Sequence, residues 1–203
     1  MSQVVGILGY QGCIEPHEAI FRQLGIPSLR VRTPEDLARI DRLILPGGES
    51  TTMLRFIKRL DMKPALQRFA DSHPVWGICA GSILAARCVL NPSQESLDLM
   101  DLEAHRNFYG SQLDSFAAAL AIQGLPEPVE AHFIRAPLLK PLAPTSGRPT
   151  PIVESSLGGQ PVFISQGHRW ACSFHVELGQ GSALHERFVK LSAPSLPQQR
   201  VQA

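Results

Sequence analysis

Short apolar runs alternate with amphipathic segments along the first 90 residues of the chain. Helical spacing runs from Glu18 to Leu24 and again after the Pro46-Gly47-Gly48 turn, where Ser50 or Thr51 can cap a helix. Ala80 to Cys88 also favours a helix. The predicted strands are Val4 to Leu8, a short apolar run that we expect to be buried, then Ser28 to Val31, Leu43 to Leu45 and Val75 to Ile78. This alternation predicts an α/β fold, a three-layer sandwich whose mostly parallel central sheet is flanked by helices.

The second half of the chain has a different pattern, with strands that follow one another and little helix between them. We expect some antiparallel pairing there, a loop over the proline-rich stretch from Pro137 to Pro151, and a last helix over Ser182 to Leu191. The predicted strands are Leu113 to Ile122, Val129 to Ile134, Val162 to Ser165 and Trp170 to Phe174. We predict one domain over residues 1–192 and a flexible tail over residues 193–203.

Composition narrows the possible partners and the compartment. Of 203 residues, 19 are basic and 18 acidic, and this balance indicates neither a nucleic-acid nor a membrane-surface partner. No apolar run approaches the roughly 20 residues that a membrane helix needs, and the N-terminus reads as a strand rather than a signal peptide. The four cysteines show no metal-binding or disulfide spacing, which favours reduced thiols in a cytoplasmic protein.

Gly77-Ile78-Cys79-Ala80-Gly81 has the form of a nucleophile elbow with cysteine as the nucleophile. The glycines permit a tight turn between a strand and a helix, and the helix N-terminus next to Cys79 favours the reactive thiolate. The alternative is a buried structural cysteine between two packing glycines. We interpret Cys13, Cys88 and Cys172, which have no such turn, as core or incidental residues.

A thiolate nucleophile needs a base and a group that orients the base, and His175-Val176-Glu177 offers both. Residues i and i+2 of an extended segment face the same side, so Glu177 can hold the imidazole of His175. A structural histidine is the alternative. We predict no comparable partner for the other six histidines.

Gly47 and Gly48 follow a predicted strand, so their backbone N–H groups can approach a ligand closely. With the N–H of Ala80 they could form an oxyanion hole. A plain strand-to-helix turn is the alternative. A phosphate loop is a third interpretation, but no lysine follows in the required pattern.

Together these segments resemble the triad-type (class I) glutamine amidotransferases, and more closely the glutaminase subunit of pyridoxal phosphate synthase. The resemblance covers almost the whole chain, and its most specific motifs are Leu45-Pro-Gly-Gly-Glu-Ser-Thr-Thr-Met53 and Phe133-Ile-Arg-Ala-Pro137. Further matching segments are Gly9-Tyr-Gln-Gly12, Arg106-Asn107, Asp114-Ser-Phe116 and Cys172-Ser-Phe-His-Val-Glu177. The chain departs from the family pattern at Val176, where proline is usual, and at Tyr10 and Ser82.

The resemblance implies that Cys79, His175 and Glu177 hydrolyse L-glutamine to glutamate and ammonia. It implies no metal or cofactor, and delivery of the ammonia to a separate barrel-shaped synthase subunit within a large hetero-oligomer. The implied residues are Gly47, Gly48, Glu49, Arg106, Ile134 and Arg135 at the glutamine site, and Gly9 and Gln11 facing the partner subunit.

Two other functions fit the same residues. The first is a cysteine hydrolase or amidotransferase that serves a different acceptor, against which the Phe133 to Pro137 motif argues. The second is a binding module whose catalytic site has decayed, against which the complete set of Cys79, His175 and Glu177 argues.

Overall fold

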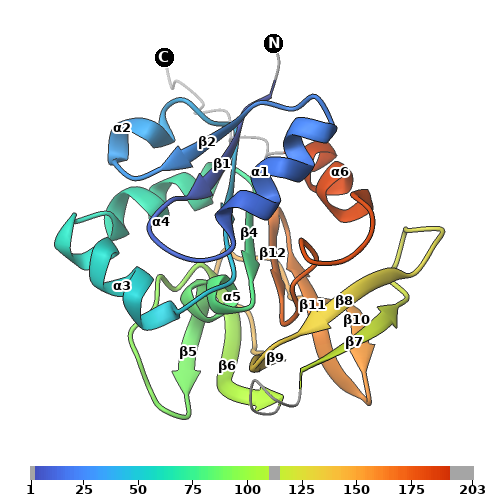
Figure 1. Cartoon of the computed structure of the whole chain (residues 1–203). Helices are drawn as coiled ribbons and strands as arrows, with labels where there is room; N and C mark the ends of the chain where they lie inside the picture. The colour runs from blue at the N-terminus through green and yellow to red at the C-terminus, as the bar shows by residue number, and fades with distance from the viewer. Residues whose placement is uncertain (1–2, 110–114, 193–203) are drawn as a thin grey trace, which may run out of the picture.

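The computed structural model describes residues 3–109 and 115–192, and it places a seven-stranded sheet at the centre of the protein (Figure 1). The strand order is β10-β11-β12-β4-β3-β1-β2. From β12 to β2 all neighbouring strands are parallel, whereas β11 runs antiparallel to both β10 and β12. The strands are β1 (Val5–Leu8), β2 (Ser28–Val31), β3 (Arg42–Leu45), β4 (Val75–Ile78), β10 (Ile152–Leu157), β11 (Gln160–Gln166) and β12 (Arg169–Cys172).

Helices cover both faces of this sheet, and each face has its own apolar core (Figure 1). Phe21 and Phe188 pack on one face with Ile44 and Trp76. Helices on the other face pack against Leu8, Leu43 and Leu45. The first face carries α1 (Ile14–Gln23) and α6 (Ala183–Lys190), and the second carries α2 (Pro34–Leu37), α3 (Ser50–Arg59), α4 (Lys63–Ser72) and α5 (Ala80–Ala85). The predicted three-layer α/β sandwich is therefore confirmed, as is the antiparallel pairing in the second half.

Two smaller sheets lie at the end of the central sheet where the strands β1, β3 and β4 terminate (Figure 1). The first has the order β5-β6-β9 and the second is the β7–β8 hairpin. Their strands are β5 (Ala86–Leu90), β6 (Met100–Tyr109), β7 (Phe116–Leu120), β8 (Val129–Phe133) and β9 (Ala136–Pro141).

Several predictions about individual elements are wrong. The helix expected over Ala80 to Cys88 ends at Ala85, and the chain continues as β5 because it pairs there with β6. The predicted loop from Pro137 to Pro151 begins with β9, an edge strand, where proline is tolerated. Glu49 occupies the N-cap position of α3, so neither Ser50 nor Thr51 caps that helix.

Other elements were missed or start elsewhere than expected. β6 was not predicted because its sequence is polar and its last residues are partly exposed, and β10, α2 and α4 were not predicted either. Helix α1 begins four residues before the predicted start at Glu18. Asp114, the start of the strand predicted over Leu113 to Ile122, and the predicted tail lie outside the described residues. Among the described residues, no helix combines the length and apolar character needed to cross a membrane.

Candidate active site

Cys79 lies between β4 and α5 in a strained backbone conformation. Its φ is +48° and its ψ is −103°, a region that residues with a side chain rarely adopt. Its N–H donates a hydrogen bond to the carbonyl of Cys172 at the end of the neighbouring strand β12, at 2.8 Å. A Cβ on Gly81 would lie 1.8 Å from the carbonyl oxygen of Leu45. The turn can therefore pack against β3 only with glycine at that position, as the elbow motif predicts.

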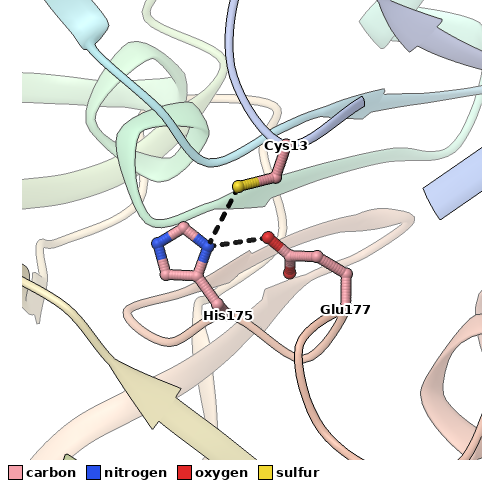
Figure 2. A group of neighbouring side chains, drawn as sticks. All are labelled: Cys13, His175 and Glu177. Atoms are coloured by element: carbon pink, nitrogen blue, oxygen red, sulfur yellow. Dashed lines mark hydrogen bonds and ion pairs between the residues drawn. The ribbon is translucent and has the colours of Figure 1, made fainter. Parts of the chain in front are cut away.

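His175 and Glu177 lie on the loop between β12 and α6, and Figure 2 shows the ring of His175 directed at the carboxylate. Nδ1 of His175 and Oε1 of Glu177 are 2.7 Å apart, and both side chains are buried. The backbone of His175 exchanges two hydrogen bonds with His132 of β8, at 2.8 and 3.2 Å. The β7–β8 hairpin therefore fixes the loop that carries this pair.

Burial and charge determine the protonation of the pair. Burial lowers the pKa of His175, but hydrogen bonds to Cys13, Cys79 and Glu177 outweigh burial and raise that pKa to about 12. Burial raises the pKa of Glu177, but the hydrogen bond and charge of His175, with His17 nearby, bring it down to about 2. At neutral pH the pair is therefore an imidazolium held by a carboxylate, ready to donate a proton.

A cavity of about 360 Å³ opens beside Cys79 and His175. This volume lies in the range of small-molecule binding sites. The lining residues are Gln11, Cys13, Gly48, Glu49, Ser50, Cys79, Ala80, Ile83, Arg106, Asn107, Ile134, Arg135, His175 and Leu178. The cavity thus brings together residues from both halves of the chain, including all those predicted for the site except Gly9, Gly47 and Glu177.

The three exceptions lie behind the cavity wall. Gly47 packs on the ring of His175, because a Cβ at this position would lie 2.2 Å from Cε1 of that ring. Glu177 contacts Nδ1 of His175 on one side and lies 3.8 Å from Nε2 of His17 on the other, and the carbonyl of Gly9 accepts a hydrogen bond from Nε of Arg32 at 3.0 Å.

The Gly47-Gly48 turn is tied to the loop that follows β1. The backbone N–H of Glu49 donates to Oε1 of Gln11 at 2.7 Å, and the carbonyl of Gly47 accepts from the N–H of Cys13 at 2.9 Å. Gly48 has a φ of +151°, which favours glycine. Gln11 therefore positions the turn that the sequence suggests as an oxyanion hole.

Charged groups and strained backbone also occur among the residues that line the cavity. Nη2 of Arg106 lies 3.6 Å from Oε1 of Glu49, so the cavity presents both a cation and an anion. Asn107 and Arg135 have φ values of +53° and +46°. With Cys79, they make up three of the six non-glycine residues with positive φ in the described part of the chain, so strain concentrates at this cavity.

The interpretation of Cys13 as a core or incidental residue is wrong, because it belongs to the site. Its sulfur lies 3.9 Å from Nδ1 of His175 (Figure 2), and it lines the cavity. Its place just after β1, at the same sheet edge as the elbow, was a signal that could have identified it. The donor atoms of Cys13, His175 and Glu177 lie within 4.8 Å of one another and could hold a metal ion, but only by breaking the His175–Glu177 hydrogen bond.

The prediction that no other histidine has a nearby carboxylate partner is wrong. His105 contacts Glu103 at 2.5 Å, and His132 contacts Glu130 at 3.2 Å. Both partners lie two residues away in the sequence, on strands. In these two segments the glutamate precedes the histidine, whereas Glu177 follows His175.

The three departures from the family pattern each have a place in the structure. Val176 is buried between the two residues of the pair. The hydroxyl of Ser82 lies 2.8 Å from the carbonyls of Gly77 and Cys172, so it links the elbow to β12. The hydroxyl of Tyr10 donates to the carbonyl of Arg32, and its ring stacks on Phe56.

The fold places a thiol, an imidazole and a carboxylate group close together at one edge of the sheet, and comparison with known proteins identifies the class of the chain as that of the glutamine amidotransferases. The SNO glutamine amidotransferase family matches residues 7–193, so the chain belongs to that family. A solved structure described as a glutamine amidotransferase superimposes with a TM-score of 0.84 at 34% identity, covering 92% of this chain and 97% of that one.

Two curated relatives are more specific. The chain is 40% identical to "Pyridoxal 5'-phosphate synthase subunit PdxT" of Fervidobacterium nodosum, over 93% of this chain and 96% of the relative. It is 41% identical to the protein of the same name from a Roseiflexus species, over 92% of this chain and 99% of the relative. The resemblance drawn from the sequence motifs is therefore confirmed.

Proposed function

We propose that this protein is the glutaminase subunit of a pyridoxal phosphate synthase. In this role it hydrolyses L-glutamine to L-glutamate and ammonia, and the ammonia passes to a barrel-shaped synthase subunit bound to it in a large hetero-oligomer. The observation that carries the catalytic part is the placement of Cys79 and the His175–Glu177 pair beside one cavity. Family membership and the names of the relatives support the substrate and the partner.

The proposed reaction begins with attack of the Cys79 thiolate on the side-chain carbonyl carbon of glutamine. The oxygen of the tetrahedral intermediate gains the negative charge, and backbone N–H groups of Gly47, Gly48 and Ala80 stabilise it. The imidazolium of His175 gives its proton to the leaving nitrogen, the C–N bond breaks, and ammonia departs. A glutamyl thioester on Cys79 remains.

Hydrolysis of the thioester restores the enzyme. Neutral His175 takes a proton from water, the hydroxide adds to the thioester carbonyl, and the C–S bond breaks to release glutamate and the thiolate. Glu177 stays ionised throughout and stabilises the imidazolium. This sequence of steps needs no metal or cofactor.

The charged residues that line the cavity suit the other end of glutamine. We assign Arg106 and Arg135 to its α-carboxylate, since guanidinium groups bind carboxylates in a two-pronged way, and Glu49 to its α-ammonium. Gly48 and Ile134 complete the glutamine site. Gly9 and Gln11 face the partner in this proposal, and all of these roles fall within one domain over residues 1–192. Four free cysteines agree with a cytoplasmic location.

The test is ammonia release from glutamine by the wild type, by Cys79→Ala and by the matched control Cys88→Ala, each with and without a pyridoxal phosphate synthase barrel subunit. Cys88 lies in β5 and does not line the cavity. Cys79→Ala should lose ammonia release by a factor of at least about 10³, and Cys88→Ala should retain it. Residual activity of Cys79→Ala near the wild-type level would exclude the thioester mechanism.

The assays with and without the barrel subunit test whether the chain serves a pyridoxal phosphate synthase. A rise in glutaminase activity when the barrel subunit is added supports a subunit of pyridoxal phosphate synthase. Full activity of the chain alone, unchanged by that subunit, would instead favour an amidotransferase for a different acceptor.

A further inference from the structure

Three buried polar atoms behind the active site have no hydrogen-bond partner among the described residues. They are Oε2 of Glu177, Nε2 of His17 and Nδ1 of His185. All three residues are buried, and His17 and His185 are completely so. Since an unpaired buried polar group is unfavourable, their arrangement calls for a physical account.

The three side chains form a row that joins the two helices on one face of the sheet. His17 belongs to α1, His185 belongs to α6, and their Nδ1 and Nε2 atoms lie 2.9 Å apart. Nε2 of His17 lies 3.8 Å from Oε2 of Glu177, the oxygen that His175 does not contact. The ring of His185 packs against Trp76 and Phe21.

The chemistry of the row allows one arrangement of protons. Glu177 is ionised and can only accept, so Nε2 of His17 must carry a hydrogen to face it favourably. Burial keeps the pKa of His17 below its usual value and lowers that of His185 to about 3, so both rings are neutral. Nδ1 of His17 is then unprotonated and accepts a hydrogen bond from Nε2–H of His185. Nδ1 of His185 is also unprotonated and lies among apolar groups.

We propose that His17, held in this tautomer by His185, is a positioning residue that directs its Nε2–H at the second oxygen of Glu177. The proposal rests on the proposed function, in which Glu177 orients His175. At 3.8 Å the contact is longer than a hydrogen bond, so it acts through the N–H dipole.

Contact of His175 with one oxygen of Glu177 and of His17 with the other should keep the carboxylate in place during the reaction. His175 holds Oε1 only while Nδ1–H points at it, and the ring must gain and lose a proton at Nε2 in each turnover. A second N–H on Oε2 keeps the carboxylate ionised and in one orientation during that exchange. His17 touches neither the cavity nor the substrate, so its removal should lower kcat more than it changes KM.

The first test is direct observation of the tautomers by nitrogen-15 NMR of the imidazole rings in the wild-type chain, with signals assigned from a His17→Gln sample. Both rings should be neutral and protonated on Nε2 between about pH 6 and pH 8. A proton on Nδ1 of His17, or a charged ring at either position, would overturn the proposal. This test requires no catalysis.

The second test compares His17→Gln with His17→Leu in the glutaminase assay. A glutamine amide can accept from His185 and donate to Glu177, whereas leucine can do neither. His17→Leu should lower kcat by about tenfold with little change in KM, and His17→Gln should recover most of that loss. Equal losses in both variants would mean that His17 only fills space, and the positioning role would be wrong.

His73, which stacks on Phe69 and does not line the cavity, provides the matched control as His73→Gln. It should keep the wild-type kcat. If His17→Leu does not fold, His17→Gln and the NMR measurement still decide the question. Absence of ammonia release from the wild type would contradict the proposed function, while the tautomers remain measurable and judge the positioning proposal separately.

Discussion

Two of the histidine–glutamate pairs that lie two residues apart in the sequence have similar contact distances but different surroundings. On the loop after β12, His175 and Glu177 are 2.7 Å apart, with side chains 7% and 0% exposed. On β6, His105 and Glu103 are 2.5 Å apart, with side chains 17% and 24% exposed, and Lys140 lies 3.7 Å from the same carboxylate. Spacing and contact distance alone do not distinguish them.

The difference lies in what surrounds each pair. The pair on β6 is partly solvated and shares its charge with a lysine, and the hydrogen bond from His105 lowers the pKa of Glu103. The pair at the sheet edge is enclosed by Gly47, two thiols and the His17–His185 row, where water cannot weaken the attraction. A His–Glu pair can therefore act as an acid–base pair when it is buried beside a nucleophile. The spacing of the two residues in the sequence does not reveal whether the pair is buried.

The largest expected effect comes from neutralising the buried carboxylate. Glu177→Gln should lower kcat for ammonia release by about 10² to 10⁴, because the imidazolium of His175 loses its counter-charge and its orienting partner. Glu103→Gln is the matched control at the same spacing and should change kcat less than twofold. Similar losses in both variants would remove the distinction between the two regions.

Gly47→Ala tests the wall that encloses the buried pair. Its new Cβ would lie 2.2 Å from Cε1 of His175, so the ring must move and its alignment with Cys79 is lost. We expect kcat to fall by about 10- to 100-fold, since a displacement of about 1 Å can have that effect. Gly25→Ala is the control: its φ of +68° makes the substitution strain the backbone, but no atom lies within 4 Å of the new Cβ and Gly25 does not line the cavity, so kcat should stay unchanged even if stability falls. Wild-type turnover by Gly47→Ala would show that the ring is not confined.

Burial of neutral histidines behind the site should make the fold sensitive to acid. The folded pKa of His185 is about 3, below its ordinary value of 6.5, so the unfolded state binds a proton first as the pH falls. Stability is thus complete above about pH 6.5 and declines toward pH 3, by up to about 1.4 kcal/mol per pH unit for this group. Urea unfolding at several pH values measures the slope, which His185→Leu should flatten. An equal slope in both proteins would contradict the assignment.

The smallest effect is expected at the partly solvated pair of Glu103 and His105. Its contribution is present above the unfolded pKa of Glu103 and is lost as the pH falls through the lower folded value. Because a partly solvated ion pair contributes about 0–1 kcal/mol, Glu103→Gln should change the unfolding free energy at pH 7 by no more than that. Chemical denaturation of the wild type and the variant at pH 7 and pH 4 provides the measurement. A loss of several kcal/mol would mean that this pair behaves as a buried one.

The parallel part of the fold could largely be predicted from the sequence because β1, β3 and β4 are short apolar segments that are buried throughout, although β2 at the sheet edge is only partly buried. β2 and β4 match the predicted ranges Ser28 to Val31 and Val75 to Ile78. β6 and β9 could not be predicted in the same way, because one is polar and partly exposed and the other contains prolines at a sheet edge. Their pairing with each other, between residues 27 to 39 positions apart in the sequence, determines that they are strands.

The residues of the candidate site likewise fall into those that could be predicted from the sequence and those that could not. The elbow around Cys79 is recognisable from its two glycines, of which Gly77 is required by the turn itself and Gly81 by close packing on Leu45 of β3. Cys13 and the row of His17 and His185 belong to no local motif, since Cys13 and His17 lie more than 150 residues from His175, Glu177 and His185 in the sequence.

By itself the sequence determined the α/β class, the glycine-flanked turn that carries Cys79 and the family to which the chain belongs, because these depend on local sterics, hydrophobic periodicity and motifs. The tertiary structure alone decided which His–Glu pair is buried, which second thiol reaches His175, and what stands behind Glu177. Those properties depend on desolvation and on distances between segments far apart in the chain, and the spacing of residues along the chain predicts neither of them.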